Sequence, residues 1–341
     1  METVLVDPQR KAEWDEFVYN NPDTISWHVY DWHKILKDHY RLPYYPLAVY
    51  DGGRVVGILP LYHVRTWRLR NALISIPYFV AGGIVAENPA AKRLLLEKAI
   101  ELSARLGSAP IILKQYGSPV DSDDLGVDTG FYNLELTLST GTDRLWAEIA
   151  EDNKQQVTLS WQWDLELEYP SGDLDAYYRL LSDHHHRAGV PGPSKAWVRS
   201  LLDSQMYSIA LLHLNGSIAA GTLVKTFKDT VSFPLTALRR DDETGLMFAY
   251  RLYWDLIVRQ AAEGMRIFHS GRIPNHNDVP VYRLGWGGEQ HRYYYQYYGY
   301  SGQTEKQSKR GRGRQVFEQV WRRIPRPIAQ AISPVIVRQF P

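Results

Sequence analysis

The chain has 341 residues, of which 44% are hydrophobic and 13% aromatic, a length that predicts two domains of about 150 residues, each able to bury a core. Cysteine is absent, which excludes thiolate catalysis, disulfides and Cys-ligated metal sites. The net charge of +1 is unevenly distributed. From Gly302 onward nine Lys/Arg stand against two Asp/Glu, so this tail carries about +7 and the rest of the chain about −6.

The N-terminal stretch METVLVDPQRKAEWDEF has charges every few residues and lacks the apolar core of a secretory signal. The longest uncharged run, 71–86, is short for a span of about 20 residues and is broken by Pro77. We therefore expect a cytoplasmic protein. The basic segment 306–326 is the part that would contact the inner face of a membrane.

In the first half, PLAVYDGGRVVGILPL (46–61) predicts a β-hairpin whose tight turn lies at Asp51-Gly52, because Asp-Gly tolerates the positive φ that such turns need. Apolar residues at helical spacing over 95–106 predict a helix that ends at Gly107. The apolar stretch IILK (111–114) then predicts a strand.

The second half repeats this order. ALLHLNGSIAAGTLVK (210–225) predicts a hairpin with its turn at Asn215-Gly216, and a helix over 247–261 ends at Gly264 before the strand RIFHS. In both hairpins a glycine follows the turn glycine by five residues, at Gly57 and Gly221.

A further helix over 174–187, capped by Ser171 or Asp173, precedes the second hairpin, and the Tyr-rich stretch RYYYQYYGY is expected to close the second sheet. This order predicts an α/β (α+β) fold with two tandem GNAT-like acyltransferase domains and mixed central sheets. The expected bounds are 1–150, 151–301 and a basic, partly helical tail over 302–341.

One succession of motifs resembles a known family. A late strand leads to Gly271-Arg272, then to the pair Tyr282-Arg283, then to GWGGE (285–289) and a Tyr-rich strand. This succession resembles the Fem peptidyltransferase family, and within it the FemAB-related proteins associated with bacterial exopolysaccharide and exosortase gene clusters. GILPLYHV, LISIPYFVAGGI, RAGVPGPSKAWVRSL and VWRRIPRPIAQAISPVIVRQ extend the likeness over nearly the whole chain. The chain departs from the family at His269, where an acidic residue is usual, and at Arg283, where a lysine is usual.

The resemblance implies transfer of an acyl or aminoacyl group to an amine of a cell-envelope peptide, amino sugar or lipid-linked precursor, with the working cleft in the second half. Arg283 takes the position of a lysine near the reacting carbonyl, with Tyr282 as the wall beside it. Because arginine stays protonated, Arg283 would donate hydrogen bonds to the developing oxyanion rather than act as a base. Arg272 would hold an anionic part of a substrate, or form a structural salt bridge.

The general base is left open by the sequence. Histidine has an intrinsic pKa near neutrality, which makes His269 and His276 candidates; Glu289 or Asp278 would be candidates if burial raised their pKa, and deprotonation by the substrate itself would need none of them. The remaining candidate substrate contacts are Trp286, Tyr250, His186 and Arg187. Each histidine, and the end of the 174–187 helix, has a structural alternative as a hydrogen-bonded polar group.

The acyl donor is also open: aminoacyl-tRNA, acyl-CoA or another acyl carrier. CoA-dependent GNAT enzymes place a glycine-rich turn where this chain has RRDDETGLMFAY (239–250), and its three acidic residues would repel a pyrophosphate. Transfer RNA would need a basic face, which a body charge of about −6 does not favour. No metal is expected at DHHHRAG (183–189), because successive helical side chains point about 100° apart.

Two alternative functions remain: an acetyl-CoA-dependent N-acetyltransferase of the same fold, and a non-catalytic scaffold of an exopolysaccharide assembly system. In the tail, an apolar stripe of Val316, Val320, Trp321 and Ile324 accompanies the basic run. It predicts either docking to a membrane surface through 306–326 or a terminal helix packed on the domain behind a solvated basic linker. The oligomeric state is not predicted.

Overall fold

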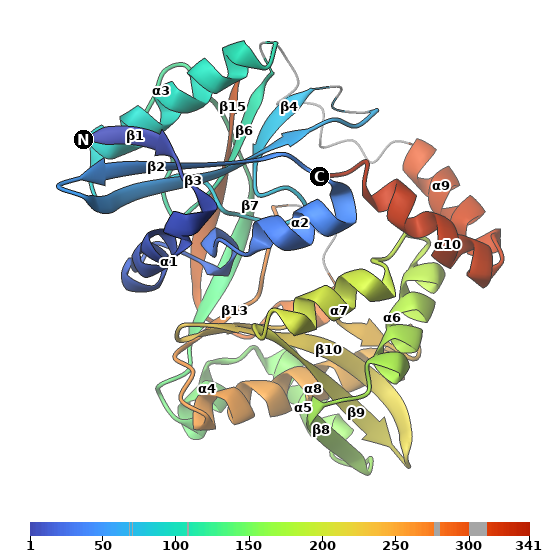
Figure 1. Cartoon of the computed structure of the whole chain (residues 1–341). Helices are drawn as coiled ribbons and strands as arrows, with labels where there is room; N and C mark the ends of the chain where they lie inside the picture. Colours follow the sequence, from blue (N-terminus) through green and yellow to red (C-terminus); the bar gives the residue numbers. More distant parts are fainter. Residues whose placement is uncertain (68, 70, 108, 276–279, 300–311) are drawn as a thin grey trace. The chain divides into compact units, whose positions relative to one another are not determined.

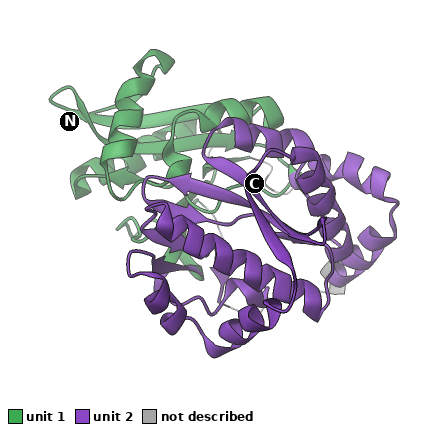
Figure 2. Cartoon of the chain, turned by 90° about the horizontal axis from the view of Figure 1, so that it is seen from below, with its two compact units in different colours: residues 1–131, 292–309, 338–341 green, residues 132–291, 310–337 purple. Residues whose placement is uncertain are grey.

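The computed structural model describes the chain except for residues 68, 70, 108, 276–279 and 300–311 (Figure 1). Contacts divide it into two compact units, coloured separately in Figure 2: unit 1 comprises 1–131, 292–309 and 338–341, and unit 2 comprises 132–291 and 310–337. The expected domain bounds 1–150, 151–301 and 302–341 stay a prediction. The contact-defined units follow other limits, because strands β7 and β15 each run from one unit into the other.

Unit 1 is a mixed sheet with the strand order β1-β2-β3-β4-β6-β15, antiparallel except for the parallel pair β4 and β6. Its strands are β1 (Glu2–Leu5), β2 (Tyr44–Asp51), β3 (Arg54–Val64), β4 (Ala72–Ser75), β5 (Val85–Ala86), β6 (Ile111–Tyr116), the first part of β7 (Gly126–Thr137) and the last part of β15 (Glu289–Tyr298). Its helices are η1 (Pro8–Arg10), α1 (Lys11–Asn20), η2 (Ser26–His28), α2 (Trp32–Tyr40) and α3 (Pro89–Arg105).

The first hairpin forms as expected, but its turn is one residue later than predicted. Gly52 and Gly53 occupy the positive-φ positions, at 58° and 83°, because Asp51 is still paired with Arg54. The predicted helix is α3, which Asn88 caps by accepting a hydrogen bond from the Ala91 amide, and Gly107 follows it at φ 78°. The apolar face of α3 packs into a core cluster with the strands of this unit.

The strands of unit 2 have the order β7-β13-β11-β10-β9-β8 and are antiparallel except for the parallel pair β11 and β13. Besides its part of β7, its strands are β8 (Leu165–Ser171), β9 (Tyr207–Leu214), β10 (Ser217–Phe227), β11 (Thr230–Ser232), β12 (Ala237–Leu238), β13 (Ile267–His269) and β14 (Ile273–Pro274). Its helices are α4 (Thr142–Glu148), α5 (Glu151–Ser160), α6 (Leu174–Ala188), α7 (Lys195–Asp203), α8 (Glu243–Ala262), η3 (Val281–Arg283), α9 (Arg312–Arg323) and α10 (Arg326–Val337).

Local signals in unit 2 are where the sequence predicts them. Asn215 and Gly216 form the β9–β10 turn at φ 49° and 72°. Asp173, one of the two predicted caps, accepts a hydrogen bond of 2.8 Å from the Ala176 amide at the start of α6. Gly264 follows α8 at φ 90°.

The glycine that the two hairpins share has the same use in both units. A Cβ on Gly57 would lie 2.8 Å from Ala86 Cβ, and one on Gly221 would lie 2.9 Å from Leu211 Cδ2. Both glycines therefore permit close packing of neighbouring elements on the hairpin.

Helix α8 packs its apolar side on one face of the unit 2 sheet. Tyr253 lies at the centre of this core, with Phe268 of β13 at 6.3 Å between ring centroids and Trp286 stacked at 5.9 Å. Helix α6 contacts β10 and β12. Because Val224 belongs to the α8 core and strand side chains alternate, Lys225 faces the other side of the sheet.

The Tyr-rich strand β15 corrects one expectation. It was predicted to close the second sheet, yet residues 293–298 pair antiparallel with β6 in unit 1. Tyr293 and Tyr295 are buried there with Ala81 in a small cluster. Alternate tyrosines of the strand are thus core residues, as the period of a strand requires.

Candidate functional site

A row of polar side chains crosses four strands of unit 2. In the strand register, Lys225 of β10 pairs with Ser232 of β11, Ser232 pairs with His269 of β13, and His269 pairs with Glu135 of β7. The chain neighbours of these four residues belong to the core on the α8 side: Val224, Val231, Phe268 and Leu136. Alternation therefore places all four polar side chains on the opposite face of the sheet.

Glu135 joins this row to a further histidine. Its Oε1 lies 3.3 Å from His269 Nε2, and its Oε2 lies 3.5 Å from His291 Nε2. The Glu135 and His269 side chains are only 17% and 20% exposed. We call Glu135, Lys225, Ser232, His269 and His291 the polar row.

Burial sets the charge states within the polar row. It lowers the pKa of Lys225 from 10.5 to about 7. Burial also lowers the pKa of His269 to about 3, and the charges of Lys225 and His291 act in the same direction. Near neutral pH the imidazole of His269 is therefore uncharged, and Lys225 is divided between ammonium and free amine.

Arg283 lies at the end of η3 and holds the turn that follows His269. Its Nη2 donates hydrogen bonds to the carbonyl oxygens of Ser270, at 2.8 Å, and Arg272, at 3.2 Å. From the other side, Asn133 Oδ1 accepts a bond of 3.0 Å from the Gly271 amide. With respect to the described residues, Nε and Nη1 of Arg283 make no hydrogen bond, so these N–H groups can serve a ligand.

The aromatic residues predicted beside Arg283 are core residues. Tyr282 is 4% exposed and Trp286 1%, and Trp286 Nε1 donates a bond of 2.7 Å to the Tyr282 carbonyl oxygen. Burial raises the pKa of the Tyr282 hydroxyl, and Tyr250 is also buried, 6.1 Å from Trp286 between ring centroids. Their side chains support η3 from the core, and their contact with a substrate stays a prediction.

The other predicted residues fall into two places. Arg272 and Glu289 are exposed, Arg272 in the turn held by Arg283 and Glu289 at the start of β15. On α6, His186 Nε2 donates a bond of 2.8 Å to the Ile324 carbonyl oxygen, and Arg187 Nε donates one of 2.7 Å to Asp241 Oδ2. The contacts of His186 and Arg187 thus engage the tail and the 238–241 loop, whereas His269, Arg272 and Arg283 meet around one turn.

His276 and Asp278, the other candidates for the base, lie outside the described residues. Sequence reasoning missed Lys225, Glu135 and His291. A lysine between buried strand residues, and a glutamate alternating with leucines in NLELT, were the available signals. The parallel pairing of β11 with β13, which places them in one row, has no local signal.

At the start of α8 a side chain of the cap accepts a hydrogen bond from one of the first-turn amides. Asp242 Oδ1 accepts a bond of 3.0 Å from the Gly245 amide, and Arg240 forms an ion pair with the Asp242 carboxylate. A Cβ on Gly245 would lie 2.1 Å from the Arg240 carbonyl oxygen, so the turn closes tightly on the helix. The carboxylate of the cap occupies the place where a helix N-terminus could receive a phosphate.

No protein-family model matches the chain, and no curated protein matches it in sequence. Solved structures do match. FemX has a TM-score of 0.70 at 13% identity, covering 87% of this chain and 97% of its own. The C-terminal domain of a putative lysylphosphatidylglycerol synthetase from Agrobacterium fabrum has a TM-score of 0.57 at 12% identity, covering 85% and 91%.

A tandem GNAT protein from the clavulanic acid biosynthesis pathway has a TM-score of 0.53 at 13% identity, covering 89% of this chain and 99% of its own. These likenesses show the fold. They confirm the expected mixed α/β tandem GNAT architecture, and they confirm the resemblance to Fem proteins in fold. Within the described part of the chain, the helices are too short or too polar to cross a bilayer.

Proposed function

We propose that this protein is an N-acyltransferase that moves an acyl or aminoacyl group to an amine of a cell-envelope peptide, amino sugar or lipid-linked precursor. The fold it has in common with FemX supports this class of reaction. The observations that carry the proposal are Arg283, fixed to the 270–272 turn, and the Glu135–His269 pair on the strand that leads into this turn. These residues combine hydrogen-bond donors, on Arg283, with side chains that can hold a proton.

The chemistry needs an uncharged amine that attacks the carbonyl carbon of the donor. As the C–N bond forms, negative charge develops on the carbonyl oxygen. The C=O double bond forms again when the bond to the leaving group breaks and the donor's carrier departs with that electron pair. Arg283 is fixed through Nη2, so its remaining N–H groups are oriented in advance toward that oxygen. Such preorganised donors stabilise an oxyanion without reorganisation during the reaction.

The attacking nitrogen must also lose a proton. His269, with a pKa of about 3, is a weak base at neutral pH, whereas Lys225, with a pKa of about 7, matches the working pH of a general base. We therefore assign proton acceptance to Lys225, with Glu135 and His269 holding the polar row in place. Arg272, exposed in the turn beside Arg283, is assigned to an anionic part of the acceptor.

The start of α8 bears on the identity of the acyl donor. The Gly245 amide of its first turn already donates to Asp242, so this donor is not available to a CoA pyrophosphate. This supports an acyl donor other than acyl-CoA, with aminoacyl-tRNA and other acyl carriers left as the alternatives.

The test is transfer of label from a mixture of ¹⁴C-aminoacyl-tRNAs to a fraction of cell-envelope precursors, repeated with ¹⁴C-acetyl-CoA. Arg283→Ala and Lys225→Met should each lower the rate by about 100-fold or more, because a positioned oxyanion donor or base contributes at least that factor. Arg266→Ala, whose side chain is 71% exposed just before β13, is the matched control and should react at the wild-type rate. Full activity of Arg283→Ala would refute the oxyanion role, and transfer from acetyl-CoA alone would establish the acetyltransferase alternative.

A further inference from the structure

Helices α9 and α10 are fixed to α6 within unit 2 (Figure 1). Arg322 Nε donates a bond of 2.9 Å to the Arg187 carbonyl oxygen, and its Nη2 donates one of 3.2 Å to that of Ala188. These are carbonyls of the last turn of α6, which lack a partner within their own helix. A cation at this end also complements the helix dipole. Helix α9 therefore sits in a defined orientation on α6.

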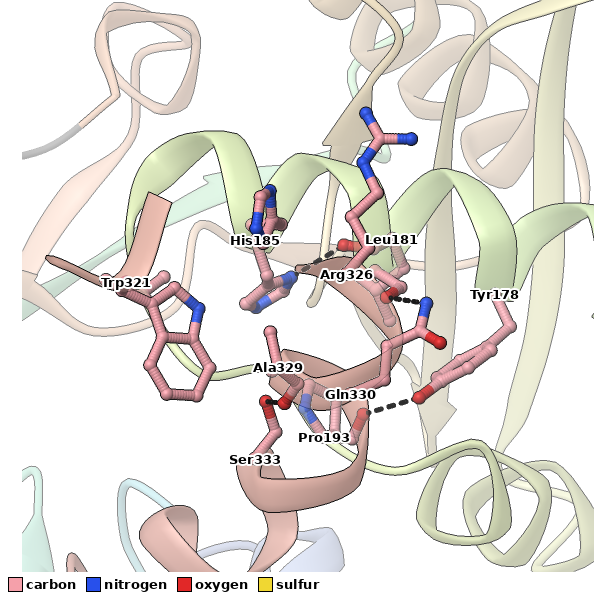
Figure 3. Close-up of a pocket in the computed structure, with 13 residues that line it drawn as sticks. Tyr178, Leu181, His185, Pro193, Trp321, Arg326, Ala329, Gln330 and Ser333 are labelled. Carbon is pink, nitrogen blue, oxygen red and sulfur yellow. Dashed lines mark hydrogen bonds between the residues drawn. The ribbon is translucent and has the colours of Figure 1, made fainter. Parts of the chain in front are cut away.

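Helix α10 is fixed in the same way. Gln330 Nε2 donates a bond of 2.7 Å to Ser182 Oγ, and Arg326 forms an ion pair of 3.2 Å with Asp183. Figure 3 shows Gln330 of α10 extending toward α6, near Tyr178. The cavity left between the helices measures about 20 Å³, so they are closely packed.

The predicted stripe of α9 is divided in the structure: Trp321 is 2% exposed and Ile324 is half-buried, whereas Val316 and Val320 are exposed. In α10 the residues buried against the body are small, Ala329 at 3% exposure and Ser333 at 7%. Several large apolar residues face solvent: Val316 is 57% exposed, Val320 52%, Ile328 53% and Val335 65%. Core packing accounts for Trp321 and not for the exposed residues.

These exposed residues form a stripe on each helix. Val316 and Val320 are four residues apart on α9, and Ile328 and Val335 are seven apart on α10, so each pair shares a helical face. Because the opposite faces are held by α6, neither stripe can turn inward without breaking the hydrogen bonds to that helix.

The charge of the same segment selects the partner. Residues 312–337 contain five arginines and one glutamate; Arg322 and Arg326 contact α6, and Arg323 is exposed beside the α9 stripe. An apolar stripe beside an exposed guanidinium group in a basic segment fits the interface of an anionic bilayer, where acyl chains take the apolar residues and a lipid phosphate meets Arg323. Nucleic acid would supply the phosphates but no apolar phase for the valines.

We propose that the outward faces of α9 and α10, formed by Val316, Val320, Arg323, Ile328 and Val335, are a docking surface for an anionic lipid bilayer. Docking is peripheral: the stripes enter the headgroup region while the faces held by α6 stay on the protein.

The experiment is sedimentation of the full-length protein with vesicles of phosphatidylcholine containing 30% phosphatidylglycerol, and with vesicles of phosphatidylcholine alone. We expect binding to the anionic vesicles that weakens as salt is raised. Val316→Ser/Val320→Ser/Val335→Ser should weaken it at least tenfold, since it removes three apolar side chains from the interface. Arg323→Gln should weaken it about fivefold.

The matched control is Leu5→Ser/Leu159→Ser, which changes leucines that are 51% and 45% exposed on other elements and should bind like the wild type. Unaltered far-ultraviolet circular dichroism would show that the variants are folded. Equal vesicle binding by the triple variant and the wild type would overturn the proposal. Two other results would also overturn it: binding of the protein to RNA but not to anionic vesicles, or a dimer that the wild type forms and the triple variant does not.

Discussion

The guanidinium of Arg283 stabilises the 270–272 turn, so replacing it should weaken the fold as well as the chemistry. We predict that Arg283→Ala lowers the stability of unit 2 by about 2 kcal/mol. Hydrogen bonds from a charged donor contribute about 1.5–3 kcal/mol when buried. The bond to the buried Ser270 carbonyl supplies most of this, because the carbonyl of the exposed Arg272 can bind water instead.

For a unit of this size, 2 kcal/mol corresponds to a fall of about 4–8 °C in the unfolding midpoint. Differential scanning calorimetry of Arg283→Ala, Arg283→Lys and the Arg266→Ala control measures it. The unfolding midpoint of Arg283→Lys should lie between those of Arg283→Ala and the wild type, because one ammonium can still donate to the Ser270 carbonyl oxygen. If Arg283→Ala melts within about 1 °C of the control, the two hydrogen bonds do not hold the turn and the reasoning fails.

Three further predictions concern the polar row and its surroundings. Lys225→Met should be more stable than the wild type near pH 7, and the difference should shrink toward pH 10.5. Because the folded-state pKa is about 7, unfolding takes up a proton throughout this window, and the free energy of unfolding of the wild type rises by up to about 1.4 kcal/mol per pH unit. Urea unfolding at pH 7, 8.5 and 10 would reveal or disprove this rise. His269 should stay neutral at pH 5, so its ring signals in NMR should not move between pH 7.5 and 5. The wild type should lose stability as pH falls from 6.5 toward 3, and His269→Gln should abolish this loss. A ring that titrates near 6.5 would contradict both expectations. Gly288→Ala should lower the free energy of unfolding by about 2–4 kcal/mol, because φ is 93° and the new Cβ would lie 2.4 Å from the Glu135 carbonyl oxygen. Gly172→Ala, with open space around it, should change this free energy little in the same denaturation assay.

Residue patterns predict those parts of the fold that depend on neighbours in the chain. The caps of α6 and α8, the turn at Asn215-Gly216 and the glycines after α3 and α8 all act within a few residues, so their signals are local. The hairpin turn at Gly52-Gly53 was missed by one residue, because Asp-Gly and Gly-Gly are both suitable turn pairs and only strand register decides between them.

The candidate site was predicted only in part, for the same reason. Arg283, His269 and Arg272 lie near one another in the chain and are found around one turn. Lys225 and Glu135 come from strands far apart in sequence, and only the pairing of β10, β11, β13 and β7 puts them in the same row. His186 seemed suited to a substrate groove, yet its imidazole is taken by the Ile324 carbonyl, a long-range contact that no local pattern encodes.

Residues 132–291 interrupt unit 1, and this has a consequence for synthesis of the protein on the ribosome. Strand β6 is complete at Tyr116 and pairs with β4, but its other partner, β15, is made only when residue 298 is reached. At about 5–20 residues per second, the edge of β6 that faces β15 waits roughly 10–40 s with its amides and carbonyls unpaired. During that interval the nascent chain exposes an open sheet edge, which is the part of the chain most able to pair with another molecule.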